Sequence, residues 1–194
     1  MPLNIPIFLT WLRVALIPLV VGVFYLPHAM LSPDAQGLAS TLIFIVAAVT
    51  DWLDGFLARR WNQTSAFGAF LDPVADKLMV AGALLILVHL NRVDAVIAFI
   101  IIGREITISA LREWMAQIGA SKSVAVSSLG KIKTAAQMIA IPMLLYYDDL
   151  FGVIDTRLFG AWLMVVAAVL TVWSMFYYMR RAWPLIKENA GKLL

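Results

Sequence analysis

The chain lacks cysteine altogether and carries little charge. None of its 194 residues is cysteine, which excludes a disulfide framework, a cysteine zinc site and a thiol nucleophile. Only 14% of the residues are charged, whereas an ordinary soluble domain has about 25%. The net charge of +3 is too small to indicate a nucleic-acid partner.

Apolar residues take the place of the missing charge. They make up 62% of the sequence, and the mean hydropathy is +0.89. A soluble core of this size could not bury so much apolar surface, because small domains leave much of their surface exposed. Disorder is excluded as well, since disordered chains combine low hydrophobicity with high net charge. The sequence therefore predicts one domain, residues 1–194, built from several membrane spans.

Six apolar stretches each allow the roughly 20 residues that cross the hydrocarbon core. Turn-forming residues cluster between these stretches. We expect spans near residues 5–26, 38–60, 65–90, 93–114, 129–147 and 157–179. A backbone in lipid must satisfy its own hydrogen bonds, and the composition suits helices rather than an alternating barrel. The expected fold is all-α, a polytopic membrane protein with a bundle of six transmembrane helices.

The first stretch and the distribution of basic residues set the expected topology. Arg13 lies inside the first stretch, and a poor cleavage site follows it, so we expect a retained helix rather than a signal peptide. Lysine and arginine gather in the connections on one side of the bundle, and aspartate gathers on the other. By the positive-inside rule, we expect the basic side and both chain termini in the cytoplasm.

Four aspartates form two pairs on consecutive predicted helices. Asp51 and Asp54 are three residues apart, and Asp72 and Asp76 are four apart, so each pair occupies one helix face. A short basic connection places all four at a similar depth near the cytoplasmic side. Clustered anions repel one another, and their hard oxygen ligands favour two divalent ions, Mg²⁺ or Mn²⁺. The alternative is a structural acid–base network that links the two helices.

Small residues accompany these acids. Gly55 and Ala58 keep one face of the second predicted helix small, and Gly68 does the same one turn before Asp72. A flat or bulky ligand could therefore approach the backbone. Arg59 adds an always-charged donor that suits phosphate. Together these residues indicate a phosphate site beside the acids.

This spacing resembles the signature of the CDP-alcohol phosphatidyltransferases. The matching pattern is Asp51-x2-Asp54-Gly55-x2-Ala58-Arg59-x8-Gly68-x3-Asp72-x3-Asp76, eight fixed positions over 26 residues. The likeness extends across nearly the whole chain to bacterial members that use glycerol 3-phosphate. Supporting segments include Gly103-Arg104-Glu105 and residues 130–134. One departure is Ile7, where many of these members have asparagine.

The resemblance implies a reaction and a set of roles. The phosphatidyl group of CDP-diacylglycerol would move to glycerol 3-phosphate, giving phosphatidylglycerol phosphate and CMP in anionic phospholipid biosynthesis. Two divalent metals would be held by Asp51, Asp54, Asp72 and Asp76, and Asp76 would also be the general base. The CDP-binding residues would be Gly55, Ala58, Arg59 and Gly68. The resemblance further implies a homodimer in the bacterial cytoplasmic (inner) membrane, with the active site open to the cytoplasm.

A second set of cations is expected to bind the phosphate of the acceptor, because the acids and their metals hold the pyrophosphate. Arg104 interrupts an apolar stretch, and intramembrane ionisable groups usually have a function. The candidates are Arg104, Arg112 and Lys133, followed by Lys131 and Arg13. Two alternatives stay open: Glu105 could simply neutralise Arg104, and Arg13 could extend to the membrane interface.

Other functions use the same residue types. An ion-coupled transporter could use the acids as its ion site, but transporters often show inverted repeats, and this sequence shows none. Within the enzyme class, serine, inositol phosphate or a second lipid could be the acceptor. Physical chemistry alone does not choose the alcohol, so glycerol 3-phosphate rests on the resemblance.

Overall fold

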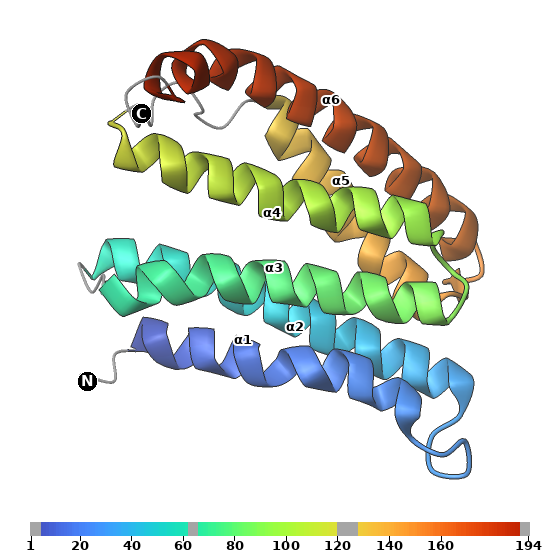
Figure 1. Ribbon diagram of the computed structural model, residues 1–194. Helices are drawn as coiled ribbons and strands as arrows, with labels where there is room; N and C mark the ends of the chain where they lie inside the picture. Colours follow the sequence, from blue (N-terminus) through green and yellow to red (C-terminus); the bar gives the residue numbers. More distant parts are fainter. Residues whose placement is uncertain (1–4, 62–65, 120–127, 191–194) are drawn as a thin grey trace.

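The computed structural model describes residues 5–61, 66–119 and 128–190. This part of the chain forms six long helices, a short 3₁₀ helix, η1 (Val23–Tyr25), and a two-stranded hairpin (Figure 1). The helices are α1 (Ile5–Gly22), α2 (Pro33–Arg60), α3 (Ala66–His89), α4 (Ala95–Gln117), α5 (Ser128–Tyr146) and α6 (Thr156–Ala190). The predicted all-α bundle of six helices is confirmed.

Three segments are long and apolar enough to cross a membrane by length and composition. They are Ile7–Tyr25, Pro33–Leu57 and Thr156–Lys187. The helices α3 and α4 have 24 and 23 residues, which is about 35 Å at 1.5 Å per residue. Both carry ionisable residues within that length, and α5 has a shorter apolar run, Ile132–Tyr146. These interruptions of the apolar pattern include four candidate site residues: Asp72 and Asp76 on α3, and Arg104 and Arg112 on α4.

The helices pack so that one end of the bundle collects the candidate site. α1 packs on α2 and α3, while α5 packs on α6 and α2, and α4 lies against α6 and α3. The start of α1, the end of α2, the start of α3 and the end of α6 lie at the same end, on the left in Figure 1. The main core is apolar, with wholly buried side chains such as Phe44, Leu84, Leu87, Ile101 and Ile141. It fixes the helix positions from which the site residues project.

Close packing at the opposite end holds α2 against α5. A Cβ on Gly37 would lie 2.9 Å from the carbonyl oxygens of Leu145 and Tyr146. Any larger residue would therefore push the two helices apart. The same two helices border the candidate site at their other ends, so this contact helps to set the width of the site.

Two helix boundaries and one connection differ from the expected ones. α2 begins at Pro33 rather than near residue 38, because Ser32 caps it by accepting a hydrogen bond from the Ala35 N–H at 3.3 Å, and proline is favoured in a first turn. α6 continues to Ala190 rather than ending near residue 179, since a helix can extend beyond its apolar segment with polar residues. The expected turn before α6 contains the antiparallel pair β1 (Asp149–Leu150) and β2 (Ile154–Asp155).

Candidate active site

Two side chains of α1 gather the acids of α2 and α3. Arg13 Nη1 lies 2.6 Å from Asp51 Oδ1, and Arg13 Nη2 forms an ion pair with Asp54. The Thr10 hydroxyl donates to Asp72 Oδ1 at 2.8 Å and lies 3.4 Å from Asp54 Oδ2. Three of the four predicted metal-binding aspartates therefore meet around Thr10 and Arg13.

The helical spacing explains this cluster. Thr10 and Arg13 are three residues apart on α1, and Asp51 and Asp54 are three apart on α2, so both pairs share a face. Arg13 is wholly buried, and a buried charge is tolerated when it is paired and hydrogen-bonded. Its side chain therefore lies inside the bundle, against these acids, and not at the surface of the bundle. The structure places Arg13 against the acids, so a contact between Arg13 and the acceptor phosphate stays a prediction.

The acids have the donor chemistry of a divalent-cation site. The charges of Asp51 and Asp54 each repel that of Asp72, and Asp76 is repelled by Asp51. Carboxylate oxygens are the ligands that Mg²⁺ and Mn²⁺ prefer. Across residues 5–61, 66–119 and 128–190, no three acidic or histidine side chains surround a common centre. Asp54 instead turns to Arg13, and Asp72 turns to Thr10. The donor set therefore fits a hard cation in its chemistry, and in this structure Arg13 supplies the compensating charge.

A cavity of about 190 Å³ adjoins the acid cluster. Four helices contribute to its wall: α2, α3, α4 and α5. The lining residues are Asp51, Asp76, Lys77, Val80, Glu105, Thr134, Gln137 and Met138. Two of the predicted acids thus share one cavity with residues of α4 and α5, where the sequence predicts the acceptor-binding cations.

Glu105 joins two of those cations beside the cavity. Arg104 Nη1 donates to Glu105 Oε1 at 3.2 Å, and Lys133 Nζ forms an ion pair with the same oxygen. Arg104 is 7% exposed and Lys133 is 1% exposed, so water compensates neither charge well. Glu105 does neutralise part of this charge, as expected if its role is to neutralise Arg104. One carboxylate cannot balance two cations, so the trio of Arg104, Glu105 and Lys133 keeps a net positive charge.

Arg112 lies on the same side of α4 as Arg104. The two guanidinium carbons are 5.4 Å and 5.9 Å from the centroid of the Tyr178 ring on α6. Arg104 Nη2 also donates to Ser174 Oγ at 3.3 Å. The Nε atoms of both arginines are buried and have no hydrogen-bond partner among the described residues. Both arginines therefore retain donors that an anion could use.

The remaining predicted site residues are only partly described. Gly55 and Gly68 are half-buried on α2 and α3, near the acids. The side chains of Ala58, Arg59 and Lys131 lie outside the described part of the structure. Sequence reasoning missed the role of Thr10 in bridging acids, and the place of Lys77 in the cavity wall. The signal for Thr10 was its position one turn before Arg13.

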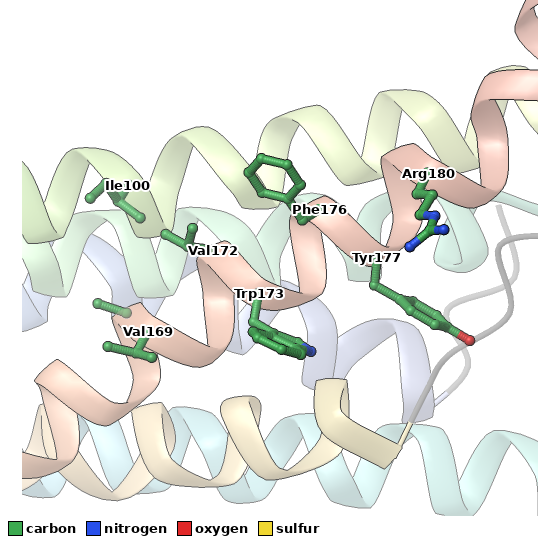
Figure 2. Close-up of a pocket in the computed structure, with 8 residues that line it drawn as sticks. Ile100, Val169, Val172, Trp173, Phe176, Tyr177 and Arg180 are labelled. Carbon is green, nitrogen blue, oxygen red and sulfur yellow. The ribbon is translucent and has the colours of Figure 1, made fainter.

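A larger groove lies away from these acids. Its volume is about 720 Å³, and it runs along α6 past Val169, Val172, Trp173 and Phe176, with Ile100 of α4 opposite (Figure 2). Arg180 at one end is its sole charged lining residue in the described part of the chain. Of the predicted metal-binding and acceptor-binding residues whose side chains the structure describes, none lines it. The chemistry therefore belongs to the smaller cavity, although the groove is larger.

This all-helical membrane bundle holds an acid cluster and buried arginine and lysine side chains beside one cavity. Because such cations suit phosphate, the combination defines an integral-membrane enzyme that acts on phosphate groups. Residues 3–173 match the CDP-alcohol phosphatidyltransferase family, and the chain belongs to that family. The resemblance seen in the acid signature is thereby confirmed.

Relatives of this chain carry a more specific name, CDP-diacylglycerol–glycerol-3-phosphate 3-phosphatidyltransferase. The protein of that name from Sodalis glossinidius (strain morsitans) is 54% identical over 185 residues. Those from Salmonella choleraesuis (strain SC-B67) and Shigella flexneri are 52% and 53% identical over 184 residues. Each alignment covers 94% of this chain and 96% of the relative.

Proposed function

We propose that this protein transfers the phosphatidyl group of CDP-diacylglycerol to glycerol 3-phosphate, forming phosphatidylglycerol phosphate and CMP. The observation that carries the proposal is the shared cavity. Asp51 and Asp76 line it, and so does Glu105, which holds Lys133 and Arg104 beside it. A donor with a pyrophosphate and an acceptor with a phosphate need two separate cationic sites. The trio of Arg104, Glu105 and Lys133 supplies one, and divalent ions held by the acids would supply the other. Relatives with about half of their residues identical carry the name of this reaction.

A divalent-cation site on the acids is the second part of the proposal. Dependence on divalent metals is general in the family. We assign two ions, Mg²⁺ or Mn²⁺, to Asp51, Asp54, Asp72 and Asp76. When bound, such ions polarise phosphoryl oxygens and stabilise both the attacking and the leaving oxygen. Arg13 then shares the compensation of the acids rather than supplying it alone.

Asp76 is the proposed general base. Its carboxylate is exposed and lines the cavity, so an acceptor hydroxyl can reach it. The carboxylate takes the proton while the hydroxyl oxygen bonds to the phosphatidyl phosphorus, and the bond from that phosphorus to CMP breaks. General-base assistance of this kind contributes about 10²–10⁴-fold. The small faces at Gly55, Ala58 and Gly68, with Arg59, are assigned to the CDP group.

Arg104, Arg112 and Lys133 are assigned to the acceptor phosphate. Their excess positive charge and the free Nε donors of the arginines support this assignment. Glu105 holds Arg104 and Lys133 at one point, so less side-chain entropy is lost when the anion binds. Lys131 and Arg13 are secondary candidates for the same phosphate.

The topology follows from the same residues. The described basic residues Arg60, Arg180, Arg181 and Lys187 lie at the ends of α2 and α6, on the site's side of the bundle. By the positive-inside rule, this side faces the cytoplasm. We therefore place the protein in a bacterial inner membrane, in contact with membrane lipids, with both termini and the active site on the cytoplasmic side. The homodimer is proposed on the family resemblance alone.

An acceptor panel tests the proposed reaction. Purified protein in lipid nanodiscs receives CDP-diacylglycerol and Mg²⁺ with glycerol 3-phosphate, serine, inositol phosphate or phosphatidylglycerol. CMP release and the lipid product are measured together. We expect matched CMP and phosphatidylglycerol phosphate with glycerol 3-phosphate alone. Efficient transfer to another acceptor, without transfer to glycerol 3-phosphate, would contradict the proposal.

A further inference from the structure

Gln137 is a buried amide that the proposed reaction has not yet used. It lies on α5 one turn after Lys133, and its side chain is 3% exposed. It lines the cavity shared by Asp51 and Asp76. Its Oε1 atom is buried and accepts no hydrogen bond from the part of the chain that the structure describes.

An unpaired acceptor in this position is unusual. The large majority of buried side-chain polar atoms in folded proteins have a hydrogen-bond partner, because an unsatisfied one costs the full desolvation of the group. The neighbouring Thr134, although exposed, is already paired, since its hydroxyl donates to the Gly130 carbonyl at 2.9 Å. Among the described residues that line the cavity, Gln137 is therefore the uncharged acceptor that remains available for a ligand.

We propose that Gln137 accepts a hydrogen bond from the C2 hydroxyl of glycerol 3-phosphate and selects acceptors that have this hydroxyl. The inference rests on the proposed function and adds a specificity determinant to it. The acceptor has three polar groups. Its phosphate goes to Lys133 and the arginines, and its attacking hydroxyl goes to Asp76. The C2 hydroxyl is the group left, and Gln137 is the unpaired acceptor in the same cavity.

The spacing on α5 fits an acceptor of three carbons. Residues four apart on a helix have Cβ atoms about 5–6 Å apart, so Lys133 and Gln137 are neighbours on one face. One small molecule can reach both. A carboxamide also matches a hydroxyl in both directions, because Oε1 accepts the O–H and the N–H can donate to the hydroxyl oxygen. Unlike a carboxylate, it adds no negative charge next to the phosphate.

Three fixed contacts also give the site a handedness. The phosphate, the attacking hydroxyl and the C2 hydroxyl occupy three different places around C2. In the mirror-image molecule, sn-glycerol 1-phosphate, the first two groups can be held only if the third points elsewhere. Gln137 should therefore discriminate between the two enantiomers as well as between molecules with and without the hydroxyl.

The experiment compares three acceptors in the full-length protein in nanodiscs: sn-glycerol 3-phosphate, sn-glycerol 1-phosphate and 3-hydroxypropyl phosphate, which lacks the C2 hydroxyl. For each, kcat/KM is measured in the wild-type protein, in Gln137→Met and in Thr134→Val. Methionine has a similar length but no comparable acceptor. Thr134→Val is the matched control, because it removes a polar group of the same cavity that is already paired.

The wild-type protein should prefer sn-glycerol 3-phosphate over both analogues by about tenfold or more, the scale of one hydrogen bond together with an acceptor left unpaired. Gln137→Met should reduce both preferences to near one, and Thr134→Val should leave them intact. Equal use of the three acceptors by the wild-type protein would overturn the inference even if the variant fails to fold. Unchanged preferences in Gln137→Met would do the same. Failure of the proposed function would look different, since the wild-type protein would then transfer to none of the three.

Discussion

Lys133→Met separates acceptor binding from donor binding most directly. The substitution keeps most of the length of the side chain and removes its charge. Lys133 is 1% exposed, so solvent contributes little to its compensation, and its ammonium shares Glu105 Oε1 with Arg104. After the substitution, Glu105 balances Arg104 alone. The group beside the cavity falls from a net charge of +1 to zero, because two cations and one carboxylate become one of each.

The size of the effect follows from the bond that is lost. A hydrogen bond to a charged group contributes about 1.5–3 kcal/mol, which corresponds to about one to two factors of ten in affinity. The KM for glycerol 3-phosphate should therefore rise by about 10–100-fold, where KM tracks binding. The KM for CDP-diacylglycerol should change little, since the acid cluster lies across the cavity. Arg112→Ala should show the same pattern for the same reason.

The assay measures CMP release in nanodiscs while each substrate is varied in turn. Arg157→Ala is the control for loss of a basic residue. Arg157, at the start of α6, forms an exposed ion pair with Asp148, which lies before α6, and it lines no part of the cavity. It should leave both KM values unchanged. A rise in the donor KM for Lys133→Met, with the acceptor KM unaffected, would refute the reasoning and assign this cation to the pyrophosphate.

Three further predictions test the acids and the packing. Asp76→Asn should abolish transfer while largely keeping CDP-diacylglycerol binding, because asparagine keeps one oxygen ligand but takes no proton; equal losses in both would make Asp76 mainly a ligand. Exhaustive chelation should stop turnover, and added Mg²⁺ or Mn²⁺ should restore it; full activity in chelator would exclude the metal assignment. Gly37→Ala should lower the free energy of unfolding by about 1–3 kcal/mol through overpacking against α5. Gly103→Ala should not, because a Cβ at that position would meet nothing within 4 Å. Thermal unfolding in detergent compares the two variants, and equal melting temperatures would contradict the packing argument.

The sequence predicted the helices and the acids for the same physical reason. A membrane span must be long and apolar, so each departure from that pattern is conspicuous, and the four aspartates depart from it at regular helical spacing. The end of α6 was missed because a helix that leaves the apolar region loses the signal without losing its hydrogen bonds. The start of α2 was missed because the turn residues Ser32 and Pro33 also favour a helix N-terminus.

Contacts between distant helices could not be read from spacing alone. Nothing in the residues around Arg13 shows that its guanidinium meets Asp51 and Asp54, about forty positions further on. The same holds for Glu105 and Lys133, which the fold joins across α4 and α5. A single sequence shows which charges lie in a span. The packing of α1 on α2, and of α3 on α4 and α5, decides which of them become partners.

The separation of the two charged groups follows from the chemistry of joining two anions. A pyrophosphate and a phosphate monoester repel each other, so a single cationic site would bind one and hinder the approach of the other. Here the carboxylates lie on α2 and α3, while the cation-rich trio lies on α4 and α5, with a cavity of about 190 Å³ between them. In the proposed reaction, divalent ions held by the carboxylates would compensate the pyrophosphate, and the trio would compensate the phosphate of the acceptor. In the same proposal, the shared cavity would leave the attacking hydroxyl next to Asp76, where the new bond to phosphorus would form.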